Sequence, residues 1–418
     1  MEIIIFGLYL FGLCALIFRG KFFTVEGIKK PLLVLLWGVK LLVGIYFYVL
    51  FSCSASYKGA CPSESFFESS EKMYWLHSRE RSIFWDFMLG NEANSDSEDY
   101  QREATWTQWD MPSENPLIND NHTVIRVNTA LYCISFNFYS VHLLFMCFLS
   151  FVGSILLFKA FPKQGNKQIY AATVACFLVP SLIFWSVGVL KEPLLLLGLG
   201  GFLFNFRKIT NKFSFLTLLL LLLNILLLLC VKVSVVVMIM PLLLIFFWCQ
   251  KQPRFTFLKY TAITLLLGIF GSLYALPFVK NIPFAIYNCF TQPFVRPMND
   301  FASVCMNLET ILIVLLLVIC LPFGNYKRFS RNNFAVFSIF ACLYGFIFTG
   351  IFTGMTPHDA GTMMQDKAIF LPFYIYGLVY LIDTDRFMHF FRIRKRKKKK
   401  NFDIVQGFEE RMNNMKRW

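Results

Sequence analysis

The sequence predicts an all-α fold, a polytopic bundle of about eleven transmembrane helices with one large extracytoplasmic loop. Three observations lead to this fold class. Of the 418 residues, 57% are hydrophobic and only 16% are charged, whereas about a quarter of a soluble domain is charged. Apolar runs of spanning length recur along most of the chain. The connections between these runs alternate between basic and poorly basic.

The apolar runs give the candidate spans in order. They are residues 2–18, 31–52, 138–158, 169–188, 190–206, 213–231, 233–249, 257–278, 308–324, 333–353 and 368–384. Several are near the lower limit of about 17 residues for a spanning helix. The first run lacks a preceding basic region and a small-residue cleavage motif, so we expect a retained span and not a cleaved signal peptide.

Basic residues predict the orientation of these spans. Every second connection carries Lys and Arg, and the tail carries RIRKRKKKK at 392–400. Basic connections mark the cytoplasmic side. We therefore expect an N-terminus outside, a cytoplasmic C-terminus and a location in the cell inner (plasma) membrane. The basic tail is interpreted as an anchor near anionic lipid, and nucleic acid is not an expected partner.

This topology divides the chain into four parts. Residues 1–52 hold the first two spans, 53–128 form the extracytoplasmic loop, 129–384 form the multi-span body and 385–418 form a basic cytoplasmic tail. A loop as long as the second part usually has a task of its own. Within it, the spacing of aromatic residues over 65–78 predicts an amphipathic helix along the membrane surface.

Polar residues that could support chemistry concentrate in the outward connections. The cytoplasmic connections are short and basic, and the sequence has no glycine-rich phosphate loop, GxSxG or HExxH motif. Most of the twelve cysteines lie in apolar runs, and none forms a zinc-site pattern. A disulfide could form between Cys53 and Cys61 or between Cys289 and Cys305. We expect any reaction site on the extracytoplasmic face.

The segment FLVPSLIFWSVGVLKEPLLLLGLGG, residues 177–201, places two charges between long apolar runs. Lys191 and Glu192 precede Pro193, which is typical of a first helical turn. Glu192 there would be stabilised by the helix dipole by about 0.3–1 kcal/mol. One interpretation is that these residues only begin a span. The other is that Trp185, Lys191 and Glu192 line a site for an anionic amphipathic substrate such as a lipid-linked phosphate.

Other outward residues are candidates for the same substrate. Besides Trp185 and Lys191, the predicted substrate-binding residues are Arg296, His358 and Lys367. A solvated surface position explains each cation alone. Several cations on one face favour phosphate binding more strongly than any single one does.

An outward carboxylate is the expected general base, because an attacking sugar hydroxyl must lose a proton. The candidates are Glu64, Glu68 and Glu192. Glu64 and Glu68 would share a helix face, and a solvated acidic face explains them equally simply. No metal ligands are predicted, although a divalent cation is a candidate cofactor.

Two further polar residues lie inside predicted spans. Lys40 is in the middle of the second span, so a partner within the membrane is expected. His142 is interpreted as a hydrogen-bonded histidine of the bundle and not as a catalyst.

Four blocks carry a resemblance to a known family. NDNHTVIRVNTAL, VPSLIFWSVGVLKEPLLLLGLG, QPFVRP and DKAIFLPFYIYGLVYLID, within 118–384, resemble a family of Bacteroidetes-type multi-pass proteins of glycan-assembly context. Relatives tend to read FW-S-S-G-K-E/D, and Val187 departs from the second serine. The layout is more distantly similar to GT-C polyprenyl-phosphate-sugar glycosyltransferases. Those enzymes carry an acidic pair soon after their first span, whereas here the nearest acids are Glu64 and Glu68, after the second.

The resemblance implies transfer of a sugar from a polyprenyl-phosphate carrier to a cell-surface glycan or lipid acceptor outside the cell. The implied partners are the bilayer, the lipid-linked sugar donor and the glycan acceptor. One alternative is a repeat-unit polymerase, whose outward loops are usually arginine-rich, whereas Arg296 is nearly alone here. Another is a non-enzymatic transporter or scaffold, for which paired, inverted halves with broken helices are expected. One interrupted pair, at 177–206, is present.

Overall fold

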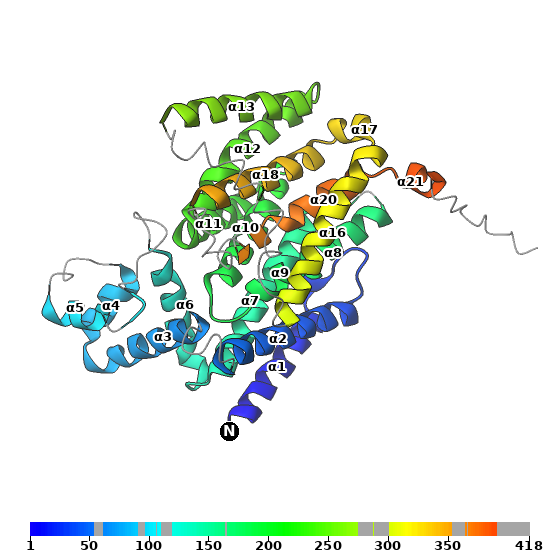
Figure 1. The fold of residues 1–418 in the computed structure, drawn as a ribbon. Coiled ribbons are helices and arrows are strands. Elements are labelled where there is room, and N and C mark those ends of the chain that lie inside the picture. Colours follow the sequence, from blue (N-terminus) through cyan, green and yellow to red (C-terminus); the bar gives the residue numbers. More distant parts are fainter. Residues whose placement is uncertain are drawn as a thin grey trace, which may run out of the picture.

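The computed structural model is all-helical wherever it describes the chain (Figure 1). It describes residues 1–53, 62–90, 97–105, 107–109, 119–163, 165–274, 287, 301–352, 364–365 and 367–390. In these ranges the β-type pairings are two isolated bridges, Val25 with Ile28 and Gly324 with Ile382. The predicted all-α class is confirmed.

The helices follow one another with short connections. They are α1 (Glu2–Arg19), η1 (Lys21–Phe23), α2 (Lys30–Cys53), α3 (Pro62–Arg79), α4 (Arg81–Leu89), α5 (Glu98–Thr105), α6 (Asp120–Ser135), α7 (Tyr139–Ala160), α8 (Asn166–Phe177), α9 (Pro180–Trp185), α10 (Lys191–Asn211), α11 (Phe215–Val231), α12 (Val233–Lys251), α13 (Thr256–Tyr274), α16 (Phe301–Phe323), α17 (Tyr326–Arg331), α18 (Asn333–Phe352), α20 (Leu371–Leu381) and α21 (Thr384–Phe390).

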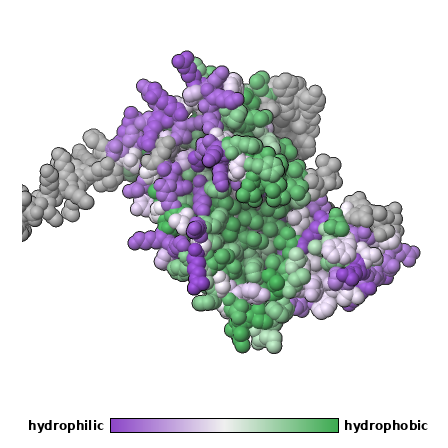
Figure 2. All heavy atoms as spheres, turned by 180° about the vertical axis from the view of Figure 1, so that it is seen from behind, coloured by the Kyte–Doolittle hydropathy of each residue, from purple (hydrophilic) through white to green (hydrophobic). Residues whose placement is uncertain are grey.

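Five of these helices, α1, α2, α7, α12 and α16, are long and apolar enough to cross a membrane. Helices α11, α13, α18 and α20 have shorter apolar stretches. Figure 2 shows an apolar band between two hydrophilic regions, one over α3–α5 and the other on the side of α17 and α21. This arrangement is that of a membrane-associated, multi-helix protein.

Helices α7 and α10 form the centre of the bundle. The α7 helix is far more buried than α1. A Cβ atom on Gly153 of α7 would lie 2.6 Å from the backbone of Leu196, and one on Gly200 of α10 would meet the carbonyl oxygen of Gly153. Small residues allow such close backbone approach between membrane helices. The helix that begins with Lys191 is therefore fixed against the core of the protein.

The predicted span at 169–188 is two helices and not one. Helix α8 ends at Phe177, and α9 begins at Pro180 and ends at Trp185. A proline has no N–H to donate, and it disfavours helical backbone at the preceding residue, here Val179. After α9 the chain turns through Gly188, whose φ of 81° is in the left-handed region. The segment singled out by its charges is thus a broken helix.

Helices α3–α6 form a cap on one end of the bundle. Helix α3 confirms the helix predicted for 65–78, and it packs against α6. Phe67 and Tyr74 of α3 both stack on Tyr132 of α6, with ring centroids 5.4 Å apart in each pair. Helix α6 continues through residue 128, where the sequence placed the boundary between loop and body.

Candidate functional site

The start of α10 is held by the cap. The N–H of Val189 donates to the Ser63 hydroxyl at 2.7 Å, and that hydroxyl lies 2.6 Å from the Tyr139 hydroxyl. A Cβ atom on Gly188 would lie 3.0 Å from the Ser63 oxygen, so a side chain there would crowd this contact. The first turn of α3 therefore positions the turn that leads into Lys191.

Lys191 forms an ion pair with Asp120. Its Nζ lies 2.6 Å from Asp120 Oδ2, and the side chains are 18% and 4% exposed. Asp120 occupies the first turn of α6, where the helix dipole favours an acid. Its other oxygen, Oδ1, is buried and has no hydrogen-bond partner among the described residues. An unsatisfied buried acceptor costs about 1–3 kcal/mol, so this oxygen is suited to a water molecule or a ligand donor.

Glu192 is the neighbouring buried acid. Its side chain is 3% exposed, and the Gln365 amide donates to its Oε1. Glu192 lies in the first turn of α10, as the sequence predicted, where the dipole stabilises its charge. The segment around Gln365 therefore packs against the beginning of α10.

A second acid, Glu309, lies in the helix break. Its carboxylate accepts hydrogen bonds from both the backbone N–H and the hydroxyl of Ser181, each at 2.6 Å. Lys367, which is 1% exposed, interacts electrostatically with Glu309. Lys367 is therefore buried beside an acid, not solvated. Burying charges is costly unless they are paired and hydrogen-bonded, as this acid is.

These contacts define one polar cluster. Because Gln365 and Lys367 are two residues apart, the short segment that holds them joins the Glu192 and Glu309 contacts. The members of the polar cluster are Asp120, Ser181, Lys191, Glu192, Glu309, Gln365 and Lys367.

Trp185 lies between the break and the turn. Its ring packs edge-on against Phe47 and Phe184. Its indole Nε1 is buried and has no hydrogen-bond partner among the described residues. A buried indole donor usually finds a partner, so this group too is available to a polar ligand.

The two acids on α3 differ in exposure. Glu64 follows Ser63, which binds the turn, and is partly buried, whereas Glu68 is exposed. An exposed position agrees with the solvated acidic face and leaves Glu68 accessible to an acceptor. Arg296 and His358 lie outside the described residues, as do Cys61 and Cys289. Cys305 carries a free thiol.

The intramembrane polar residues have partners. Lys40 Nζ donates to the Ser154 hydroxyl at 3.4 Å, which confirms the expected partner. The two ring nitrogens of His142 lie 3.1 Å from Asn128 Oδ1 and 2.9 Å from the Ser135 hydroxyl. His142 is thus a buried, hydrogen-bonded histidine, as interpreted.

His122 belongs to the cap beside the polar cluster. It stacks on Trp109 with ring centroids 3.6 Å apart, and its Nε2 lies 3.0 Å from the Trp109 carbonyl oxygen. Burial lowers the pKa of His122 to about 4, and the nearby Arg126 lowers it further, against the opposing effect of that carbonyl. His122 is therefore neutral at pH 7. In the described ranges no group of three or more His, Cys, Asp or Glu side chains could hold a metal ion.

The sequence did not single out Asp120, Ser181, Glu309 or Gln365. Glu309 carried a usable signal, because it is an acid beside the apolar run ILIVLLL. Asp120 follows a capping Asn119, which predicts a helix start but not a distant ion pair. Searches against protein-family models, curated proteins and solved structures found no match to this chain.

Proposed function

We propose that this protein is a membrane enzyme of glycan assembly that transfers a sugar from a polyprenyl-phosphate carrier to a cell-surface glycan or lipid acceptor. The observation that carries the proposal is the buried Lys191–Asp120 ion pair beside Glu192. These charges belong to a membrane-associated helical bundle and to the segment with the most specific resemblance to glycan-assembly proteins. Charges buried at this depth are costly and are usually retained for function.

The proposal includes eleven membrane passes, with the polar cluster on the extracytoplasmic side of the bacterial inner membrane. Contacts at the helix ends support it. At the end that carries the cap, Ser140 at the start of α7 bonds Glu2 of α1, and Thr123 of α6 bonds the Cys230 carbonyl near the end of α11. At the other end, Arg207 of α10 bonds the last residue of α7. Successive apolar helices, with α8 and α9 taken together, thus alternate in direction.

The reaction needs phosphate binding and removal of one proton. Lys191 and Lys367, together with Arg296, would hold the phosphate of the carrier. The acceptor hydroxyl oxygen attacks the anomeric carbon, the bond between that carbon and the phosphate oxygen breaks, and the carrier leaves as polyprenyl phosphate. A carboxylate takes the hydroxyl proton, with Glu192, Glu64 and Glu68 as the candidates.

Sugar transfer in isolated membranes tests this assignment. A radiolabelled lipid-linked sugar is supplied, and product is compared for wild type, Lys191→Ala, Glu192→Gln and Glu68→Gln. We expect a loss of about 100-fold or more in Lys191→Ala and in the variant that removes the base. Glu98→Gln is the matched control, because Glu98 is an exposed acid of the same cap. Full activity in all three site variants would exclude the proposed site.

Two alternatives are separated by their products. A repeat-unit polymerase variant would accumulate single repeat units, whereas a transferase variant would lack one sugar. The helix break at α8–α9 with buried Glu309 and Lys367 favours a transporter of a lipid-linked intermediate as the second candidate. Movement of a fluorescent lipid-linked sugar across reconstituted vesicles, without chemical change, would support that candidate.

A further inference from the structure

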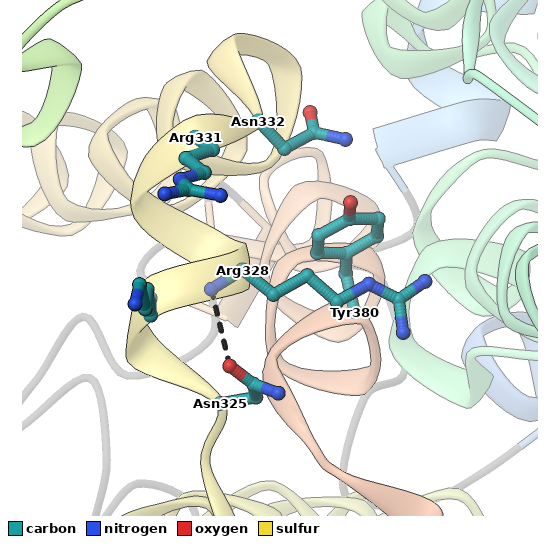
Figure 3. Close-up of a pocket in the computed structure, with 6 residues that line it drawn as sticks. Asn325, Arg328, Arg331, Asn332 and Tyr380 are labelled. Carbon is teal, nitrogen blue, oxygen red and sulfur yellow. Dashed lines mark hydrogen bonds between the residues drawn. The ribbon is translucent and has the colours of Figure 1, made fainter.

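A second polar site lies at the end of the bundle opposite the cap, where α17 meets α20. A cavity of about 460 Å³ opens there. It is lined by Asn325, Lys327, Arg328, Arg331, Asn332 and Tyr380 (Figure 3). Figure 1 places α17 and α3 on opposite sides of the molecule, so this site is distinct from the polar cluster.

The lining is cationic. Helix α17 spans six residues and contributes three basic side chains, Lys327, Arg328 and Arg331, all of them exposed. No acidic side chain is among the described lining residues. The acid beside this site is Asp383, which interacts with Arg386 at 3.7 Å and lies 3.5 Å from the Asn325 amide nitrogen. The three cations of α17 are therefore available to an anion.

The neutral lining residues are arranged as donors. The Arg328 guanidinium carbon lies 5.2 Å from the centroid of the Tyr380 ring, and this contact orients the arginine over the cavity (Figure 3). Asn332 Oδ1 accepts the Ala335 N–H at 3.0 Å, so the group that Asn332 offers a ligand is its NH₂ donor. Guanidinium, ammonium and amide donors together match the oxygens of a phosphate group.

An apolar stripe leads from α16 to this cavity. Its exposed residues recur every three or four positions, as one helix face does. They are Leu308, Ile311, Leu312, Leu315, Val318 and Leu321. The Tyr326 hydroxyl at the start of α17 donates to the Leu321 carbonyl at 2.8 Å, which joins the end of the stripe to the basic helix. A soluble phosphate would have no use for this stripe, whereas acyl chains would lie along it.

We propose that this cavity binds the phosphate of an anionic phospholipid head group, with the acyl chains of the lipid against α16. Arg328 and Arg331 bind the phosphate oxygens, and Lys327 and Asn332 complete the donor set. The sequence predicts this end of the bundle to be cytoplasmic, where anionic head groups attract basic residues. The site is separate from the proposed transfer reaction and does not depend on it.

Native mass spectrometry of the purified full chain tests the proposal. The protein is titrated with phosphatidylglycerol, phosphatidylcholine or inorganic phosphate, and lipid-bound species are counted. We expect phosphatidylglycerol to bind in preference to phosphatidylcholine, and Arg328→Gln/Arg331→Gln to weaken that binding by roughly tenfold to thirtyfold. Arg19→Gln, which removes an exposed arginine from another predicted cytoplasmic connection, should change it less than about twofold.

Three results would overturn the assignment. They are equal binding of the two lipids, unchanged binding by the double variant, and displacement of phosphatidylglycerol by inorganic phosphate at equal concentration. The last result would assign the cavity to a soluble phosphate. Lys327→Gln provides a second variant with an exposed side chain, and a several-fold loss of phosphatidylglycerol binding is expected for it as well.

Discussion

Lys191 and Asp120 place their charged atoms 2.6 Å apart although they are 71 residues apart in the chain. Asp120 is at the start of α6, where the helix dipole favours an acid, but Lys191 is at the start of α10, where it disfavours a cation. A lysine is therefore a poor choice for beginning this helix. Asp120 compensates for it, and the combination indicates a requirement for a cation at this point beyond helix formation.

The ion pair predicts non-additive stability changes. Asp120→Asn or Lys191→Met alone should lower the free energy of unfolding by about 2–3 kcal/mol, less than for a fully buried pair because Lys191 is partly exposed. The double variant should recover most of this loss, because no charge is then left unpaired. Denaturation in detergent measures all three. The exposed Arg102–Glu80 pair is the control, and its disruption should cost less than about 1 kcal/mol.

The helix crossing at α7 and α10 predicts a severe effect of added volume. In Gly200→Leu the new side chain would meet the backbone of Gly153, which no change of rotamer can relieve. We expect a loss of about 3 kcal/mol or more and a low yield of folded protein. Gly12→Leu is the matched control, since a Cβ atom on Gly12 of α1 has no neighbour within 4 Å. Equal thermal stability of the two variants would contradict the observed packing.

The cap should lose stability in acid. The pKa of His122 is about 4 in the folded protein and about 6.5 when unfolded, so unfolding takes up a proton between these values. Stability is therefore complete above pH 6.5 and is lost as pH falls toward 4. Hydrogen exchange in α6 measures this change, which His122→Phe should abolish while retaining the stacking on Trp109. His77→Gln, at an exposed histidine of α3, should leave the pH dependence intact.

Local signals were sufficient for much of the fold. Hydropathy predicted the positions of α1, α2, α7, α12 and α16, because a long apolar run must be buried in lipid or protein. The start of α10 at Lys191 also followed from sequence, because Pro193 favours a first turn. Pro180 signalled a break, but the short helix α9 between Pro180 and Trp185 required the structure.

The partners of the charged residues could not be predicted from sequence. The contact of Asp120 with Lys191 joins α6 to α10, and the contact of Ser181 with Glu309 joins residues 128 positions apart. Each contact depends on how the helices pack, and helix packing leaves no local pattern in the sequence. Lys367 illustrates the result: alone it suggests a solvated surface, but packing buries it beside Glu309.

The eleven-pass topology predicts the side on which single cysteines react. In a background without other cysteines, Ser78→Cys in α3 should react with an impermeant maleimide in intact cells whose outer barrier is opened. Lys212→Cys and Arg254→Cys should react only after lysis, because both lie in predicted cytoplasmic connections. All three replaced side chains are exposed, so access to the reagent depends on the membrane and not on burial.

Arg254→Cys separates this topology from a simpler one. If only α1, α2, α7, α12 and α16 crossed the membrane, Lys212 would still be cytoplasmic, because α7 alone would separate it from Ser78. The passage through α12 would then place Arg254 outside. With eleven passes, α11 and α12 together return the chain to the cytoplasm, so Arg254→Cys should be protected in intact cells. Labelling of Arg254→Cys before lysis would exclude α11 as a membrane pass and, with it, the alternation of helix directions on which the site's orientation depends.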